Sequence, residues 1–357
     1  MTAEFYKEGV AIIGGGPVGL FLAIKFSLKN IPVDLYEKKS WPIDKTCGQG
    51  VMPRGILLLR GIGIDTDSIG YPFSGITFID DGTHLRGRVK GNSRGIKRKD
   101  LSLCLYNKCK ENHLISLFNE EVSVVDNGKS VLLTREDGKN YHYDKIYCCD
   151  GMFSPSRLKL KQDKLSFGAK ILGRRMGARF HVPISSWSKN VEVYWKDGIE
   201  CYVTPVSNDE VELAFIWYQD RYSHSYVKNN LNNLFPEVFN HFPDFSIDDY
   251  MASGPFSLRS KSLFFKNVTF VGDSYCFIDG ITGEGLSIGF YSADLLVNGY
   301  NTRRFLLKLK ITSIYFKYSF FVYLLLLISR CKSFRRIIFK LVGRSKLFSA
   351  IINSSRV

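Results

Sequence analysis

The chain opens with apolar runs and a helical segment in the order strand, helix, strand. Residues 10–13 and 33–37 are short, mostly apolar runs, and residues 17–29 between them are expected to form a helix. Such runs are typical of parallel strands that are covered on both faces. The pattern predicts a βαβ unit at the start of an α/β fold.

The middle of the chain is rich in predicted strands. Apolar and polar residues alternate over 191–195 and 211–217, which is the period of a strand with one buried face. A last buried strand at 268–271 precedes a long helix, so we expect the chain to return to its first domain after an inserted sheet. We also expect a strand at 145–149 and helices at 54–60, 100–112, 223–235 and 285–298.

A glycine-rich turn joins the first strand to the first helix. Residues 14–19 fit the pattern G-x-G-x-x-G with Gly14, Gly16 and Gly19. In that pattern the first glycine makes the tight turn, the second lets the backbone approach a pyrophosphate, and the third allows close helix packing. Glu37 ends the second strand, where its carboxylate can accept hydrogen bonds from ribose hydroxyls. These positions predict a Rossmann-type dinucleotide-binding domain.

A second glycine-rich motif, far along the chain, separates FAD from NAD. Gly272 and Asp273 follow the strand at 268–271, and residues 279–286 form a glycine-rich turn that opens the next helix. An acid at this position can hold ribityl hydroxyls, and the backbone N–H groups of residues 283–286 can face a pyrimidine ring or an oxyanion. Because a nicotinamide dinucleotide needs no second clamp, the two motifs together predict FAD.

Three motifs in this order resemble those of the group A FAD-dependent monooxygenases of the p-hydroxybenzoate hydroxylase type and of the related geranylgeranyl reductase-like flavoproteins. The third motif is D-G-x-x-S-x-x-R at 150–157, and the resemblance spans residues 8 to about 300. It implies a glutathione reductase-like FAD-binding domain with an inserted β-sheet domain for the substrate and a helical basic tail. The expected segments are 1–160 with 261–300, then 161–260, and finally 301–357.

The resemblance also implies which residues hold the cofactors. The first motif and Glu37 would hold the ADP half of FAD, and Asp273 would lie near its ribityl and pyrophosphate groups. The motif at 150–157 would serve both FAD and NAD(P)H, the implied electron donor. The expected FAD contacts are Gly14, Gly16, Pro17, Val18, Gly19, Glu37, Lys38, Arg98, Val122, Asp150, Gly151, Gly272, Asp273, Gly283, Gly285 and Leu286.

Departures from the aromatic hydroxylase pattern leave the reaction open. After Asp273 this chain continues with Ser-Tyr-Cys and reaches Asp279, where those enzymes usually have Ala-Ala-His and a proline. The segments 44–48 and 282–285 look more like the reductase-like branch. Expected neighbours of the flavin or substrate are Cys47, Gly48 and Glu284, with a buried thiol and a helix-dipole partner as the structural alternatives for Cys47 and Glu284.

The expected activity is NAD(P)H-dependent monooxygenation of a hydrophobic or aromatic small molecule. Saturation of an isoprenoid double bond is one alternative, and action on a protein partner is an alternative of another class. Reduced flavin reacts with oxygen by itself, so the protein contributes mainly orientation and water exclusion. No particular catalytic residue is therefore predicted.

Cysteine and histidine usage argues against several kinds of site. The eight cysteines show no C-x-x-C spacing and the six histidines no metal-ligand spacing, so no metal site is expected. No secretory apolar segment precedes residue 10. Together these features predict a reducing, cytoplasmic compartment.

Positive charge is concentrated in the tail. The net charge is +15, but no Asp or Glu follows Asp294, and this last segment holds 13 Lys and Arg, which leaves +2 for residues 1–294. A nearly neutral body without a basic stacking platform argues against nucleic acid. Residues 311–329 are apolar apart from Lys317, and a basic amphipathic pattern follows. Residues 311–351 are expected either to contact the inner face of a membrane or to pack on the FAD domain, and a transmembrane span over 311–329 is a further alternative. The oligomeric state is left open.

Overall fold

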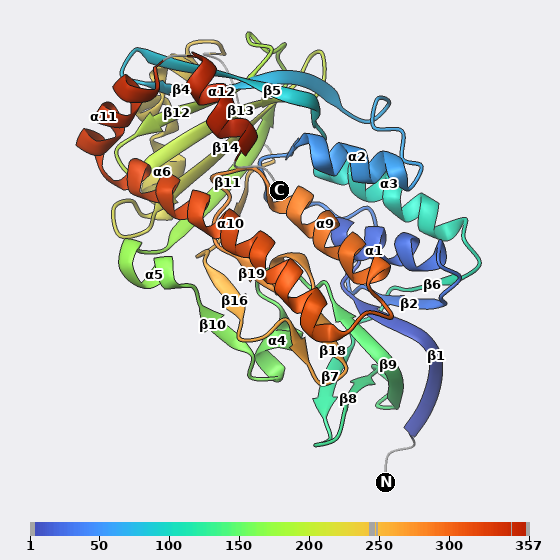
Figure 1. Ribbon diagram of the computed structural model, residues 1–357. Helices are drawn as coiled ribbons and strands as arrows, with labels where there is room; N and C mark the ends of the chain where they lie inside the picture. The colour runs from blue at the N-terminus through green and yellow to red at the C-terminus, as the bar shows by residue number, and fades with distance from the viewer. Residues whose placement is uncertain (1–3, 243–246, 248, 344, 355–357) are drawn as a thin grey trace.

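The first sheet is built on the predicted βαβ unit. The computed structural model describes residues 4–242, 247, 249–343 and 345–354 (Figure 1). β1 (Glu4–Ile13) pairs in parallel with β2 (Val33–Tyr36), and α1 (Pro17–Ser27) joins them. The remaining strands of this sheet are β6 (Ile115–Phe118), β7 (Ser123–Asp126), β8 (Val131–Thr134), β9 (Asn140–Cys148), β17 (Phe264–Phe265) and β18 (Val268–Phe270), in the order β17-β18-β9-β1-β2-β6 with β8 on β9 and β7 on β8.

Helices cover this sheet on the side where the glycine motifs lie. α9 (Gly285–Asn298) packs on α1 and on α2 (Pro53–Gly61), and α3 (Arg98–Lys110) packs on α1 (Figure 1). The apolar run of β1 is fully buried beneath them, as expected for a parallel strand covered on both faces. The return of the chain through β18, parallel to β9, brings the second glycine motif beside the first.

The second sheet has eight strands and is mainly antiparallel. Its centre is the meander of β12 (Val191–Lys196), β13 (Ile199–Pro205) and β14 (Val211–Tyr218), which contains the two alternating segments. The outer strands are β3 (Gly50–Val51), β4 (Tyr71–Asp80), β5 (Thr83–Gly95), β11 (Arg175–Val182) and β15 (Met251–Ser253), in the order β15-β11-β14-β13-β12-β4-β5-β3.

The division of the chain between the two sheets differs from the predicted segments 1–160 and 161–260. β3, β4 and β5 lie within residues 1–160 but belong to the second sheet, because β4 pairs in parallel with β12. The predicted helix at 223–235 is broken into shorter helices that pack on the outer face of this sheet. These are α6 (His224–Asn229) and α7 (Leu231–Leu234), and α8 (Pro236–Phe239) follows them. The connecting region holds α4 (Pro155–Lys159), β10 (Asp163–Leu165), α5 (Phe167–Leu172), β16 (Leu258–Ser260), the 3₁₀ turn Gly272–Ser274 and β19 (Cys276–Phe277).

The tail folds back over both sheets as three helices. α10 (Arg304–Arg330) crosses the front of the molecule, and α11 (Lys332–Val342) and α12 (Ser345–Ser354) return across β4 and β5 (Figure 1). Asn353 bonds the free edge of β5, with its Oδ1 accepting from the Lys90 N–H at 3.0 Å and its Nδ2 donating to the Arg88 carbonyl at 3.0 Å. α10 is long and apolar enough to cross a membrane, with a mean hydropathy of 1.7, although 33% of its most apolar window is buried.

A buried ion pair fixes α11 to the second sheet. Arg335 donates to Asp80 at 3.1 Å and to the Ser329 carbonyl at 3.3 Å, and both charged side chains are almost completely buried. The adjacent Asp81 accepts from Arg336 at 2.7 Å, but that pair is exposed to solvent. The neighbouring carboxylates of Asp80 and Asp81 thus form two ion pairs with α11, one buried and one exposed.

Asp80→Asn is expected to destabilise the protein by roughly 3–5 kcal/mol, because it leaves the buried Arg335 without a counter-charge. Urea unfolding followed by tryptophan fluorescence measures this loss. The matched control Asp81→Asn removes only an exposed pair and should leave the urea midpoint almost unchanged. Equal effects of the two substitutions would contradict this account of the tail.

Candidate active site

The N-terminal glycine turn opens onto a cavity. Gly14 has φ +103°, and a Cβ there would lie 2.5 Å from the Cys149 carbonyl oxygen, while a Cβ on Gly19 would lie 1.9 Å from the Gly14 oxygen. These two glycines are required by the turn and by the close packing of α1. Gly16, in contrast, has no neighbouring atom within 4 Å of a Cβ position. It leaves space at the N-terminus of α1, where backbone N–H groups and the helix dipole favour a phosphate.

The second glycine motif opens onto the same cavity. Gly283 and Gly285 also have no atom within 4 Å of a Cβ position, and α9 begins at Gly285. Asp273 of the second motif also lines the cavity, with Lys45 Nζ 3.5 Å from its Oδ2. Two helix N-termini, one acid and one cation therefore border one space, which suits a ligand with several phosphate and hydroxyl groups.

Glu37 lies at the first glycine turn, as predicted from its position at the end of β2. Its carboxylate accepts from the Gly15 N–H at 2.7 Å and from the Lys39 N–H at 2.9 Å. Trp41 closes the same turn, because its indole N–H donates to the Gly15 carbonyl at 3.0 Å. A ribose hydroxyl at this position would share the Glu37 carboxylate with these backbone groups.

In the motif at 150–157, Arg157 is bonded to other parts of the protein, whereas the end at Asp150 and Gly151 lies beside the cavity. Arg157 is fully buried and donates to the Ser274 carbonyl at 2.8 Å and to Asp163 at 2.6 Å, so it ties this motif to the loop after β18. Asp150 Oδ2 accepts from the Ser156 N–H at 3.0 Å, whereas its buried Oδ1 has no partner among the described residues. Burial raises the pKa of Asp150. Gly151, the next residue, lines the cavity.

The structure brings many of the predicted residues into one cavity wall and leaves others outside it. Lys38 forms an exposed pair with Glu121 at 3.0 Å, and Val122 packs at the edge of the main core. Predicted residues that line the cavity are Gly16, Pro17, Val18, Cys47, Gly48, Arg98, Gly151, Asp273, Gly283, Glu284, Gly285 and Leu286, and those outside the lining are Gly14, Gly19, Glu37, Lys38, Val122, Asp150 and Gly272.

The cavity has a volume of about 370 Å³ and continues from the glycine motifs to the tail. That size is typical of small-molecule sites, which span roughly 300–1,000 Å³. Because side chains alternate along a strand, one face of the second sheet supplies a single wall. Its apolar side chains include Ile76, Phe78, Val191, Val193, Ala214 and Ile216, and the facing tail side chains include Phe321, Leu324, Ile328, Phe339, Phe348 and Ile352.

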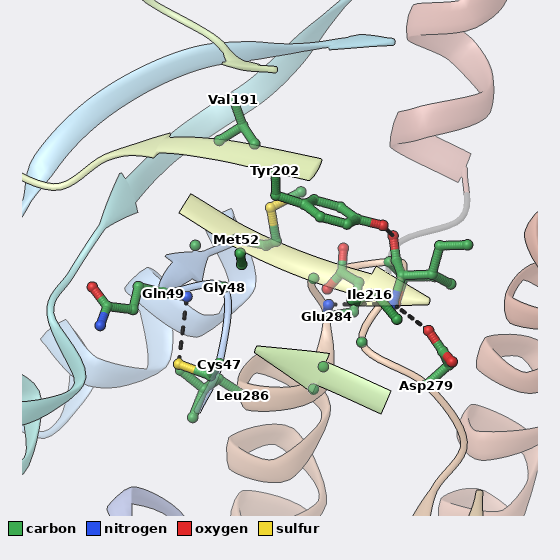
Figure 2. A pocket seen from close by; sticks show the side chains of 18 of the residues that line it. Cys47, Gly48, Gln49, Met52, Val191, Tyr202, Ile216, Asp279, Glu284 and Leu286 are labelled. Carbon is green, nitrogen blue, oxygen red and sulfur yellow. Dashed lines mark hydrogen bonds between the residues drawn. The ribbon is translucent and has the colours of Figure 1, made fainter. Parts of the chain in front are cut away.

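Tyr202 connects this wall to the second glycine motif. Figure 2 shows its ring crossing the cavity, with the phenol donating to the Ile281 carbonyl at 3.3 Å. The Ile281 N–H in turn donates to Asp279 Oδ1 at 3.0 Å. The sheet therefore holds the glycine loop through the phenol of Tyr202, and Asp279 adds a bond within the loop itself.

A buried ionic cluster lies behind Tyr202. Arg175 pairs with Asp279 at 3.2 Å and also with Glu200, and Ser329 of α10 donates to the same glutamate. Burial raises the pKa of Asp279, and the charge of Arg175 acts in the opposite direction. The cluster joins β11, β13, the glycine loop and the tail.

Glu212 is a buried carboxyl group on the cavity side of the same sheet. It is opposite His181 on β11 and opposite Thr204 on β13, and Thr204 lines the cavity. Neither carboxyl oxygen of Glu212 has a hydrogen-bond partner among the described residues, and the residue has no exposed surface. Burial raises its pKa well above the usual range, while the positive charges of Arg179 and Arg98 act in the opposite direction. The structure therefore favours the neutral acid at this position.

Sequence reasoning missed several cavity residues. Lys45 was part of a recognised segment, but its position beside Asp273 depends on the fold of a loop 228 residues away in sequence. Glu212 lies on a predicted strand, yet alternation alone does not say which face meets a ligand, and no strand was predicted at Tyr202. The acidic residue within an otherwise apolar strand was the available signal for Glu212.

A family model described as the FAD binding domain matches residues 7–239, well over half of the chain. The chain belongs to this FAD-binding family. Among curated protein sequences, none matches it.

Solved structures with the same fold include flavin-dependent enzymes. The brominase Bmp2 has 14% identity and a TM-score of 0.81, covering 98% of this chain and 92% of its own. The p-nitrophenol 4-monooxygenase PnpA from Pseudomonas putida DLL-E4 has 15% identity and a TM-score of 0.79, covering 98% and 97%. The halogenase PltM, solved with phloroglucinol and FAD, has 15% identity and a TM-score of 0.70, covering 83% and 70%. At these identities the likeness establishes the fold, and the expected group A flavoprotein fold is confirmed.

The cavity residues fit FAD. Open space at Gly16, Gly283 and Gly285 matches a ligand that approaches the backbone closely. Two buried nitrogen atoms of lining residues, Arg98 Nε and Gln49 Nε2, have no partner among the described residues and are available to a polar ligand.

Gly16→Ala is expected to weaken FAD binding by roughly tenfold or more, because the new methyl group occupies the space for the pyrophosphate. The fold without FAD should be unaffected, since no protein atom lies within 4 Å of that Cβ position. Equilibrium titration with FAD, followed by flavin fluorescence, measures the affinity. Gly61→Ala, at an equally open glycine of α2, is the control and should bind FAD normally.

Glu212→Gln is expected to flatten the pH dependence of stability. The pKa of Glu212 is raised in the folded protein, so its favourable contribution is complete below the unfolded value of about 4.3 and is lost as pH rises toward the folded value. The wild type should lose up to about 1.4 kcal/mol per pH unit relative to the variant above pH 5 while the carboxyl stays protonated in the fold. Urea unfolding of both proteins at pH 5 and pH 8 tests this, and parallel losses would refute it.

Proposed function

We propose that this protein is an FAD-dependent monooxygenase that oxygenates an apolar, aromatic or prenyl-like small molecule with electrons from NAD(P)H. The proposal rests on the separation of charged from apolar residues along the cavity lining. Its charged residues come from the segments around the glycine motifs and from the start of α3, whereas the second sheet and the tail supply mostly apolar side chains. One end suits the cofactor and the other an apolar substrate.

Oxygen transfer by a flavin depends on orientation and on exclusion of water. When bound, FAD supplies the redox chemistry. The residues of this chain would then hold and shield it: Lys45 and Arg98 supply positive charge near its polar groups, and the helix α9 directs its N-terminal N–H groups into the cavity. Phe321 and Leu324 of α10 close the apolar end against solvent.

Tyr202 has a positioning role in this proposal. Its hydroxyl is committed to the Ile281 carbonyl, and burial raises its pKa, so it remains a protonated donor at neutral pH. The residue thereby sets the distance between the sheet and the glycine loop that would face the flavin. Asp279 holds the other side of Ile281.

The similar structures support oxygenation or a related oxidative reaction. PnpA is described as a monooxygenase of p-nitrophenol, and Bmp2 and PltM as halogenases. Among the described residues we find no third nucleotide-binding glycine turn besides the two that face this cavity, so NAD(P)H would visit the FAD site transiently rather than occupy a separate Rossmann unit.

The reaction class can be tested with the FAD-loaded protein, NADH or NADPH, and a panel of phenols and prenylated phenols under ¹⁸O₂. Monooxygenation predicts substrate-stimulated NAD(P)H oxidation and one ¹⁸O atom in the product. A saturated product without ¹⁸O would instead identify a reductase, and a brominated product in the presence of bromide would identify a halogenase. Either of these outcomes would overturn the proposal.

Leu324→Trp is expected to lower substrate-stimulated NAD(P)H oxidation by roughly tenfold or more while FAD remains bound, because the indole fills the apolar end of the cavity. The control is Leu327→Trp, three residues along α10, whose side chain is exposed. It should behave like the wild type. Equal activity of both variants would show that the tail does not border the substrate.

A further inference from the structure

α10 has two different apolar faces. Its inner face is buried against the rest of the protein through Leu307, Ile311, Tyr315, Tyr318 and Val322, which recur every three or four residues. Such spacing places them on one side of the helix. This inner face explains only part of the apolar character of the helix.

Polar bonds hold the inner face of α10 in place. The Tyr318 hydroxyl donates to the Asp279 carbonyl at 2.8 Å, and the Tyr218 hydroxyl donates to the Leu326 carbonyl at 3.0 Å. Detaching α10 to cross a bilayer would expose the cavity and break these buried bonds, which makes a spanning orientation costly. The helix is thus fixed along the surface of the folded protein.

The outer face of α10 carries a second apolar row, which we call the outer stripe: Phe305, Leu309, Phe316, Phe320 and Leu327. These residues are between 46% and 75% exposed. At 3.6 residues per turn they fall within an arc of about 60°. Several exposed large apolar side chains on one side of a helix are unusual on a soluble surface and mark an interaction site.

The short helix α5 widens the outer stripe. Gly168 of α5 lies directly against the ring of Tyr323, a residue that shares the angular position of the stripe on α10. On either side of Gly168, Phe167 and Ile171 project with large exposed areas. The apolar surface therefore extends beyond a single helix.

The border of the outer stripe is basic. Lys308 lies on one side of it, and Lys310 and Lys317 lie on the other, all exposed. No acidic residue occurs anywhere after Asp294, in a segment with 13 Lys and Arg. This combination of an apolar row with a one-signed cationic border is complementary to anionic lipid headgroups above acyl chains.

We propose that the outer stripe and its basic border dock this protein onto an anionic lipid bilayer, with α10 lying along the membrane surface. A bilayer matches both features at once, because the apolar side chains enter the acyl boundary while the lysines remain among the headgroups. A flank of the same helix, between the outer stripe and the inner face, borders the cavity through Phe321, Leu324 and Ile328. Docking would therefore leave only the thickness of α10 between the cavity and the lipid.

The test uses the full-length FAD-loaded protein and sedimentation with phosphatidylcholine vesicles that contain either no phosphatidylserine or about a quarter of it. We expect strong binding only to the anionic vesicles, weakened by salt. Phe316→Ser with Phe320→Ser should reduce the partition coefficient at least tenfold, and each of Lys308→Gln and Lys317→Gln roughly fivefold.

The control is Leu28→Ser with Leu57→Ser, two exposed apolar residues that lie outside the tail in sequence, and this variant should bind vesicles like the wild type. The flavin absorbance of every variant verifies that the protein is folded and loaded. Equal binding of the Phe316/Phe320 variant and the wild type would overturn the proposal. The proposal would also be wrong if the wild type bound no vesicles and instead formed a dimer in solution that the Phe316/Phe320 variant does not form. The stripe would then bind a second copy of the chain.

Discussion

Arg175 and its two buried carboxylates are the interaction on which the assembly of the site depends. The guanidinium pairs with Asp279 of the second glycine motif and with Glu200 of the second sheet, and Ser329 of the tail donates to Glu200. Each charge is buried, so the loss of any partner leaves another without compensation. The glycine loop, the sheet and α10 must therefore dock together, and the cavity between them exists only when all three are in place.

This constraint makes the tail part of the cavity wall. An apolar cavity beside a redox cofactor must exclude water, and neither sheet closes the apolar end by itself. α10 closes it with one face, and the buried Arg335–Asp80 pair anchors α11 against the sheet behind it. The same helix is left with an exposed apolar row on its other face. One segment thus accounts both for a dry cavity and for a surface with the character of a membrane contact.

The sequence predicted the parts of the site that depend on local geometry. The turns at Gly14 and Gly272 have positive φ, which favours glycine, and both motifs are recognisable from spacing alone. The placement of β4 and β5 in the second sheet could not be predicted, because strand pairing between residues 76 and 191 is set by distant packing. The apolar pattern of 311–329 likewise indicated a helix whose apolar side chains need a partner. Amphipathic spacing does not say whether that partner is a cavity, a core or a lipid.

The central claim is that two motifs about 270 residues apart in sequence hold one FAD molecule above an apolar cavity. Hydrogen–deuterium exchange of the full-length protein, with and without FAD, tests it most directly. We predict that the amides of Gly16, Val18 and Gly19 and those of residues 283–286 become protected together on addition of FAD. Protection of the first motif alone would indicate an ordinary dinucleotide site, and protection of neither motif would contradict the account altogether.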